Sequence, residues 1–140
     1  MNNWDHRFLA LAQHVAGWSK DPGTQCGAVI TNGRRIVSVG YNGFAAGVRD
    51  HEIRLQDRAT KLAMTIHAEE NAILEAPRRP EGCTIYVWPL PPCSLCAAKI
   101  IQAGIVRVVA PEYKGGNCTD SIALGVEQFA EAMVSVDLCN

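Results

Sequence analysis

Residues 67–76 read HAEENAILEA, and residues 92–96 read PCSLC. Each stretch places metal-binding or acidic side chains directly before an apolar run with helical spacing. Pro77 stops the first run, so a helix is predicted over 67–76, and a second helix is predicted over 94–103, ending before a glycine. The residues of this second helix that are predicted to face inward are Leu95, Ala98 and Ile101.

Strands are predicted on both sides of this pair of helices. CTIYVW (83–88) and IVRVVA (105–110) are rich in β-branched side chains and flank the second helix. Upstream, CGAVIT (26–31) and RIVSVG (35–40) are separated by a short Asn-Gly turn, which is a strong hairpin signal. A hairpin is antiparallel, whereas a strand–helix–strand unit is parallel with a right-handed crossover, so the sequence predicts a mixed sheet.

Helical spacing also occurs near both ends of the chain. One helix is predicted before KDPG (20–23), another over 50–65, and a last one behind Thr119 or Asp120, followed by a short strand, VSVDL (134–138). The apolar positions of the first and last helices are Trp4, Phe8, Leu11, Val15, Trp18, Ile122, Val126, Phe129, Ala130 and Met133. The order of elements predicts an α/β protein, a three-layer α/β/α sandwich around a mixed five-stranded sheet.

The overall composition limits the classes of partner. The chain has 140 residues, of which 48% are hydrophobic and 19% are charged, and a formal net charge of -1. We expect one domain spanning residues 1–140, and the charge balance argues against nucleic acid or a membrane surface as partner. The opening MNNWDHRFLALAQ has neither a basic leader nor a long apolar core, so we expect a cytoplasmic protein whose cysteines are free thiols or metal ligands.

The chemistry is concentrated in the two opening stretches. Cys93 and Cys96 lie three residues apart at a helix start, so both sulfurs lie on one face of the first turn, where the helix N-terminus favours thiolates. With His67 they form a ligand set that suits tetrahedral zinc and leaves the fourth position to water, as in catalytic sites. Zinc lowers the pKa of such a water molecule, and Glu69 is close enough to take its proton and pass it to a leaving amine.

Each part of this pattern has an ordinary alternative. A single histidine at a helix start is more often a cap or a core residue, and a single CxxC is often a redox pair or part of a zinc knuckle. Acidic residues in a first turn suit the helix dipole, and Glu70 is interpreted as a solvated helix residue. A fourth protein ligand would contradict a catalytic site; the other cysteines are Cys26, Cys83, Cys118 and Cys139. The two motifs together favour the catalytic interpretation.

His-x-Glu followed by Pro-Cys-x-x-Cys is the signature of zinc deaminases that act on nucleobases. From about residue 16 to residue 110, the chain resembles the cytidine and deoxycytidylate deaminase family, most closely its deoxycytidylate (dCMP) branch. The segments that carry this resemblance are SKDPGTQCGAVI (19–30), GYNGF (40–44), IHAEENAI (66–73) and PCSLCAAKIIQAGI (92–105). The resemblance implies a cytidine-deaminase-like fold and one catalytic Zn²⁺ ion per chain, held by His67, Cys93 and Cys96.

The resemblance also implies a reaction and an assembly. Zinc-bound hydroxide attacks C4 of a cytosine ring, and Glu69 protonates N3 and carries a proton to the departing ammonia, which converts dCMP to dUMP. The backbone N–H of Ala68 lies near the ring carbonyl, and Asn42 contacts the sugar; a turn residue is the alternative for Asn42. Branch members are often hexamers regulated by deoxynucleoside triphosphates with Mg²⁺, and other members are dimers or tetramers, so we expect a homo-oligomer.

Two departures from the family pattern affect the expected pocket. Ala45 occupies a position where proline is common, and WPLP (88–91) makes the linker before Pro92 one residue longer. Trp88 either stacks on a base or packs in the core. The basic residues considered for a substrate phosphate are Lys20, Arg49, Arg54, Arg58 and Lys114.

Several hypotheses remain open at this point. The first is a zinc-dependent hydrolase acting on a free cytosine nucleotide, with dCMP as the preferred substrate. In the second, the same deamination acts on a different substrate: a nucleoside, a free base, another aminated heterocycle or a tRNA base. A tRNA substrate would require a basic surface. The others are a non-catalytic, zinc-stabilised binding module, against which Glu69 argues, and a thiol-disulfide enzyme using Cys93 and Cys96.

Overall fold

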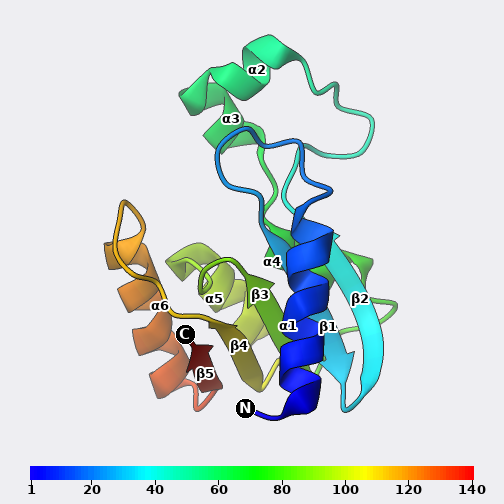
Figure 1. Ribbon diagram of the computed structural model, residues 1–140, viewed down its shortest axis with the longest axis vertical. Coiled ribbons are helices and arrows are strands. Elements are labelled where there is room, and N and C mark those ends of the chain that lie inside the picture. The colour runs from blue at the N-terminus through cyan, green and yellow to red at the C-terminus, as the bar shows by residue number, and fades with distance from the viewer.

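A computed structural model describes residues 1–140 and contains a five-stranded sheet with the strand order β2-β1-β3-β4-β5 (Figure 1). The strands are β1 (Gly27–Asn32), β2 (Arg35–Tyr41), β3 (Thr84–Trp88), β4 (Arg107–Pro111) and β5 (Ser135–Cys139). β1 pairs antiparallel with β2 and β3, whereas β3, β4 and β5 are parallel. The predicted mixed sheet, its hairpin and the short final strand are therefore confirmed.

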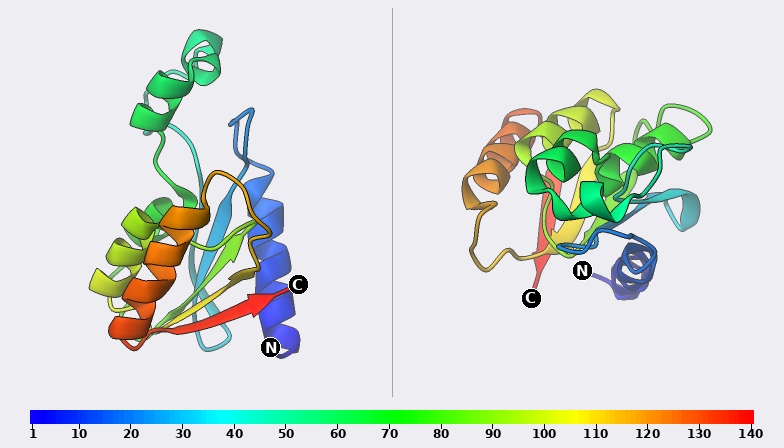
Figure 2. Two further views of the ribbon diagram at one scale, coloured as in Figure 1. Left: turned by 90° about the vertical axis from the view of Figure 1, so that its left-hand side faces the viewer. Right: turned by 90° about the horizontal axis from the view of Figure 1, so that it is seen from above.

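Helices cover both faces of this sheet. The long helices are α1 (Asn3–Ala16), α4 (Ala68–Glu75), α5 (Ser94–Gln102) and α6 (Thr119–Glu131). In the side view of Figure 2, α1 lies alone on one face, and α4, α5 and α6 lie on the other. This arrangement confirms the α/β/α sandwich. None of the helices combines the length and apolar character that crossing a bilayer requires.

Alternation along β3 divides the core into two clusters. Ile85 and Val87 belong to the cluster beneath the three-helix face, whereas Tyr86 packs with residues of α1 such as Phe8. Successive side chains of a strand point to opposite faces, and both faces of this sheet are covered, so the strand is apolar throughout. The alternation decides which residues of β3 can reach a site on the α4–α5 side.

A buried ionic cluster fixes α1 to the sheet. The Asp5 carboxylate accepts two bonds from the Arg107 guanidinium, at 2.8 and 3.0 Å, and one from the Tyr86 hydroxyl at 2.8 Å. Arg107 also donates to Asp137 on β5, at 2.8 Å. Arg107 is the main reason that the pKa of Asp5 lies well below its ordinary value. The cluster therefore ties the first turn of α1 to β3, β4 and β5.

The prediction of a single helix over 50–65 is wrong. The segment forms two short helices, α2 (Glu52–Gln56) and α3 (Arg58–Met64), which together we call the α2–α3 arm. The backbone of Asp57 between them is extended, and its carboxylate accepts a hydrogen bond from the Thr60 N–H at 3.2 Å. An N-cap of this kind starts a new helix and thereby ends the preceding one. The arm extends beyond the end of the sheet, at the top of Figure 1.

The inward face predicted for α5 is wrong at two of its three positions, while the third, Ile101, does pack against the core. Leu95 is 68% exposed and Ala98 is exposed, whereas Cys96, Ala97 and Ile100 are buried. The helix is rotated so that Cys96 points toward His67, and this rotation turns the neighbouring Leu95 to the solvent side. The predicted caps of the last helix are wrong as well, because α6 begins at Thr119 behind Cys118, whose side chain makes no capping bond.

Candidate metal centre and active site

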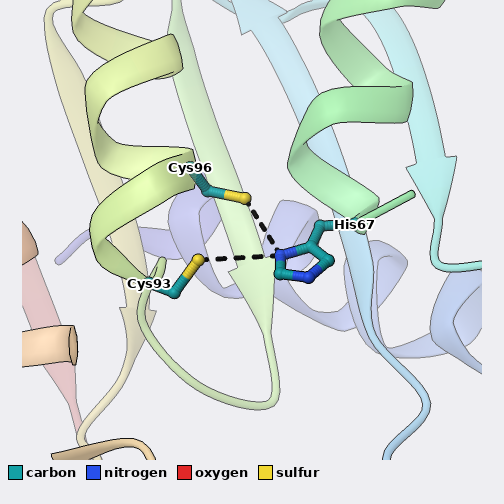
Figure 3. A group of neighbouring side chains, drawn as sticks. All are labelled: His67, Cys93 and Cys96. Carbon is teal, nitrogen blue, oxygen red and sulfur yellow. Dashed lines mark hydrogen bonds between the residues drawn. The ribbon is translucent and has the colours of Figure 1, made fainter. Parts of the chain in front are cut away.

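Three side chains from two helix starts converge between α4 and α5. His67 directly precedes α4, Cys93 directly precedes α5, and Cys96 lies in the first turn of α5. Nδ1 of His67 lies 3.2 Å from Sγ of Cys96 and 3.6 Å from Sγ of Cys93 (Figure 3). The sequence predicted these three residues as one group, and the structure brings them together.

The donor set fits a zinc ion. Zn–N and Zn–S bonds of about 2.1 and 2.3 Å at tetrahedral angles place nitrogen and sulfur about 3.6 Å apart. The distance to Cys93 matches this value and the distance to Cys96 is 0.4 Å shorter, and the three ligand atoms all lie within 4.8 Å of one another. Hydrogen bonds with Cys96 and His67 hold the pKa of the Cys93 thiol well below its ordinary value, which favours the thiolate form that binds a metal.

No fourth protein ligand completes this group. Each of the other cysteines is a free thiol, and none belongs to the cluster of ligand atoms. Cys26 and Cys118 border the same cavity, but the ligand group consists of His67, Cys93 and Cys96 alone. A site with three protein ligands beside a cavity leaves a coordination position for water or substrate, which is the arrangement of catalytic zinc centres.

Glu69 lies in the first turn of α4, beside the metal ligands. Its side chain lines the cavity although the residue is only 6% exposed, and its carboxylate is outside the ligand group. Burial raises the pKa of Glu69 to about 7. A carboxyl group with a pKa near neutrality can both accept and donate a proton at physiological pH, as a general acid–base residue must.

Glu70 has a role that the sequence interpretation missed. One carboxylate oxygen accepts a hydrogen bond from the His67 backbone N–H at 3.0 Å, and the other accepts one from Nζ of Lys99 at 2.6 Å. Glu70 therefore connects the loop that carries His67 with α5, which carries Cys96. The available signal was its position three residues after the helix-cap residue, where glutamate commonly bonds back to the cap N–H.

The metal centre opens into a cavity of about 450 Å³. Its lining includes His67, Ala68, Glu69 and Cys93 near the metal centre and three residues of α3, Arg58, Lys61 and Leu62. Loop residues between β4 and α6, including Tyr113 and Asn117, complete the lining; the sequence interpretation did not identify them. A cavity of this size, mostly apolar with a few convergent polar groups, is suited to a small organic substrate.

The substrate-contact residues predicted from the resemblance have different surroundings. Ala68 is fully buried at the first position of α4 and lines the cavity. Asn42 also lines it, but its amide oxygen accepts from the Cys26 N–H at 2.8 Å and its amide nitrogen donates to the Thr24 carbonyl at 2.9 Å. Asn42 thus uses its side chain to hold the loop before β1.

Trp88 does not border the cavity. It is the last residue of β3 and packs against the cluster on the α1 face, together with Tyr86. Val87 and Leu90 line the cavity instead. Because side chains alternate along β3, Trp88 points away from the metal ligands, so the structure corrects the prediction of base stacking in favour of core packing.

Of the five basic residues considered for a phosphate, only Arg58 borders the cavity. Lys20 pairs with Asp50 at the surface, and Arg54 donates to the backbone of Arg49. Lys61, which the sequence interpretation did not consider, also lines the cavity and forms an ion pair with Asp21. The cationic group of the cavity without an ion-pair partner is therefore Arg58.

Comparison with known proteins places the chain in a family. Residues 2–112 match the cytidine and deoxycytidylate deaminase zinc-binding region. An uncharacterized deaminase in the luxG 3′ region of Aliivibrio fischeri is 47% identical over 139 residues, which cover 97% of this chain and 93% of that protein. The chain belongs to the cytidine and deoxycytidylate deaminase family, and the resemblance inferred from its motifs is confirmed.

Deoxycytidylate deaminases are among the relatives. The Homo sapiens enzyme is 42% identical over 113 residues, which cover 76% of this chain but only 63% of that protein. A solved structure of dCMP deaminase from the cyanophage S-TIM5, in complex with dCMP and dUMP, superposes with a TM-score of 0.79 at 21% identity, covering 99% of both chains. The structural match confirms the cytidine-deaminase-like fold.

Proposed function

We propose that this protein catalyses the hydrolytic deamination of a cytosine nucleotide, with dCMP as substrate and dUMP and ammonia as products. The observation that carries the proposal is the composition of one cavity. His67, Cys93 and the buried Glu69 line it, and so does Arg58 of α3. A ring that reacts near the metal centre can therefore have its phosphate near a cation.

The metal ligands and Glu69 divide the reaction between them. His67, Cys93 and Cys96 hold zinc, which when bound lowers the pKa of a water molecule and so makes it a nucleophile near neutral pH. The Glu69 carboxylate takes one proton from the water as its oxygen bonds to C4, and delivers that proton to the ring nitrogen N3. It then takes the second proton from the hydroxyl on C4 and gives it to the amine, which leaves as ammonia while the C4 carbonyl forms. Its exclusion from solvent keeps these proton transfers within the site.

Neighbouring groups orient the ring. The backbone N–H of Ala68 belongs to the first turn of α4, where helix N–H groups have no acceptor within the helix. We assign this donor to the ring carbonyl. Asn42 shapes the sugar side of the cavity mainly by holding the loop before β1, as its bonds to Cys26 and Thr24 support.

Other expectations stay predictions. Nothing tests the expectation of one domain spanning residues 1–140, the cytoplasmic location or the homo-oligomer. The Mg²⁺ ion implied to accompany a nucleotide effector finds no support.

An ammonia-release assay on zinc-loaded protein tests the substrate. The panel is dCMP, CMP, dCTP, deoxycytidine, cytosine, adenosine and guanine, with and without dCTP as a potential activator. We expect turnover of dCMP and much weaker turnover of deoxycytidine, which differs only in lacking the phosphate. Turnover of a different compound would support the zinc-dependent reaction and contradict the assignment of dCMP as the substrate. No turnover across the panel would favour a binding module.

The Arg58→Gln variant tests the proposed phosphate contact. Because a charge-assisted bond contributes about 1.4–3 kcal/mol, we expect KM for dCMP to rise about tenfold or more, with KM for deoxycytidine unchanged. Arg54→Gln is the matched control, since Arg54 lies on the same arm but does not line the cavity. An equal rise in KM for dCMP and for deoxycytidine would show that Arg58 does not contact the phosphate.

A further inference from the structure

Within the α2–α3 arm, α3 lines the cavity without being part of the core. Neither helix of the arm has a buried residue. At the base of the arm, Gly43 and Ile66 exchange two backbone hydrogen bonds, at 2.8 and 3.1 Å. Figure 1 shows the arm standing beyond the sheet, connected to it by extended segments. Apolar burial therefore does not explain how α3 keeps its place.

One face of α3 is turned to the cavity. The residues of this segment that line the cavity are Arg58, Lys61, Leu62 and Thr65. Their spacing of three, four and seven residues puts them on a single side of a helix. The orientation of α3 thus decides whether Arg58 faces the metal centre.

A single ion pair connects this face to the rest of the chain. Nζ of Lys61 lies 2.9 Å from Oδ1 of Asp21, and the two side chains are only 15% and 10% exposed. Every other side-chain hydrogen bond made by α3 has its partner within residues 57–65. A charge pair so far removed from solvent is screened less than a surface pair, so its loss has a larger effect.

Asp21 is itself held firmly. The same oxygen accepts a hydrogen bond from the Gly23 N–H at 2.7 Å, and the Asp21 N–H donates to Oγ of Ser19 at 3.2 Å. Ser19 in turn donates to the backbone carbonyl of Asn42 at 2.8 Å. A Cβ at Gly23 would approach Nζ of Lys61 to 3.1 Å, so the loop packs closely around the ion pair.

We propose that the Asp21–Lys61 ion pair is the tether that holds α3 as the outer wall of the cavity. Asp21 and Lys61 are positioning residues, and the tether leaves Arg58 as the cation that meets the substrate's anionic group. The expected effect of the tether on KM rests on the proposed function. The attachment of the arm to the rest of the chain can be measured without any enzyme assay.

A double-mutant cycle tests the tether in kinetics. Asp21→Asn and Lys61→Gln each remove one charge while keeping a side chain of similar size. We expect each to raise KM for dCMP by about tenfold through the displaced Arg58, with KM for deoxycytidine little changed and a smaller effect on kcat. The double variant should be no worse than either single variant, because both break the same interaction.

The Lys20–Asp50 pair provides a matched control. It also joins the loop before β1 to the segment before the arm, but its side chains are 71% and 34% exposed. Lys20→Gln and Asp50→Asn should leave KM unchanged within about twofold, because exposed ion pairs contribute little. If the variants of both ion pairs raised KM equally, Asp21 and Lys61 would have no special role in holding α3.

Amide hydrogen exchange measures the tether independently of activity. In Asp21→Asn and in Lys61→Gln, exchange in residues 58–64 should become at least about tenfold faster, with α4 and α5 unchanged. Unchanged exchange in 58–64 would overturn the tether, whichever substrate the enzyme uses. A rise in KM for dCMP in Lys61→Gln but not in Asp21→Asn would instead make Lys61 a phosphate ligand and would also overturn the proposal.

Discussion

The two sides of the cavity are built in opposite ways. On the metal side, Cys96 is fully buried and Glu69 is 6% exposed, and their helices pack on the sheet. On the other side, α2 and α3 bury no residue, and Ile53 of α2 is 85% exposed. Proton transfer needs groups fixed to a fraction of an ångström, which a packed core provides. Contact with the far end of a substrate needs only a correctly oriented wall, which a polar tether can hold.

The largest effect is expected at the metal side. In Glu69→Gln, the side chain keeps its size but cannot carry a proton, so kcat should fall about 10³-fold. Zinc content and the melting temperature should stay at wild-type values, because Glu69 is not part of the ligand group. Metal analysis of the purified variant checks this, and loss of zinc would show that Glu69 is a ligand and that the proposed proton transfers are wrong.

The next largest effect concerns the core that supports the metal side. Asp5→Asn leaves Arg107 without its main partner, so the free energy of unfolding should fall by about 3 kcal/mol, measured by urea denaturation at pH 7. None of the residues of this cluster lines the cavity, so kcat and KM at 25 °C should be unchanged. A loss of activity in the folded variant would show that the two ends of the sheet are coupled.

The same variant predicts a pH dependence. The pKa of Asp5 is lower in the folded protein than its unfolded value near 3.9, so its contribution is complete above about pH 5 and is lost as the pH falls below about 4. The stability difference between wild type and Asp5→Asn should therefore shrink in acid. Urea denaturation of both proteins at a series of pH values measures this stability difference. A difference that does not change with pH would show that the pKa of Asp5 is not lowered in the folded protein.

A smaller effect is expected where the two metal-binding helices are joined. Glu70→Gln weakens the bonds to the His67 N–H and to Lys99, so zinc should be released to a competing chelator about tenfold more readily. Glu75→Gln is the matched control, because Glu75 lies on the same helix, is exposed and makes no side-chain hydrogen bond. Equal zinc affinity in both variants would show that Glu70 does not position His67.

The smallest effect is expected on the arm. Ile53→Gln should change the free energy of unfolding by less than about 0.5 kcal/mol, because its side chain is almost fully exposed. Ile100→Ala, at a fully buried position of α5, should cost about 2–5 kcal/mol. Thermal denaturation of both variants makes the comparison. A large loss of stability in Ile53→Gln would mean that the arm packs against another surface in solution.

Much of the fold could be predicted because its signals are local. Asn-Gly between two apolar runs specifies a hairpin, and the strand–helix–strand order around α5 specifies a parallel crossover. The break at Asp57 was missed because loosely spaced apolar residues over 50–65 concealed the capping bond to Thr60. The inward face of α5 was missed because the position of His67, and not apolarity alone, decides its rotation.

The sequence by itself determined which residues form the metal centre, because the His-x-Glu and Pro-Cys-x-x-Cys motifs place His67, Glu69, Cys93 and Cys96 at two helix starts. Only the tertiary structure decided what surrounds that chemistry. It turned Trp88 to the far face of the sheet and brought Arg58 and Lys61 to the cavity. It also paired Lys61 with Asp21, forty positions earlier. Contacts between distant segments depend on how elements pack, which no local pattern specifies.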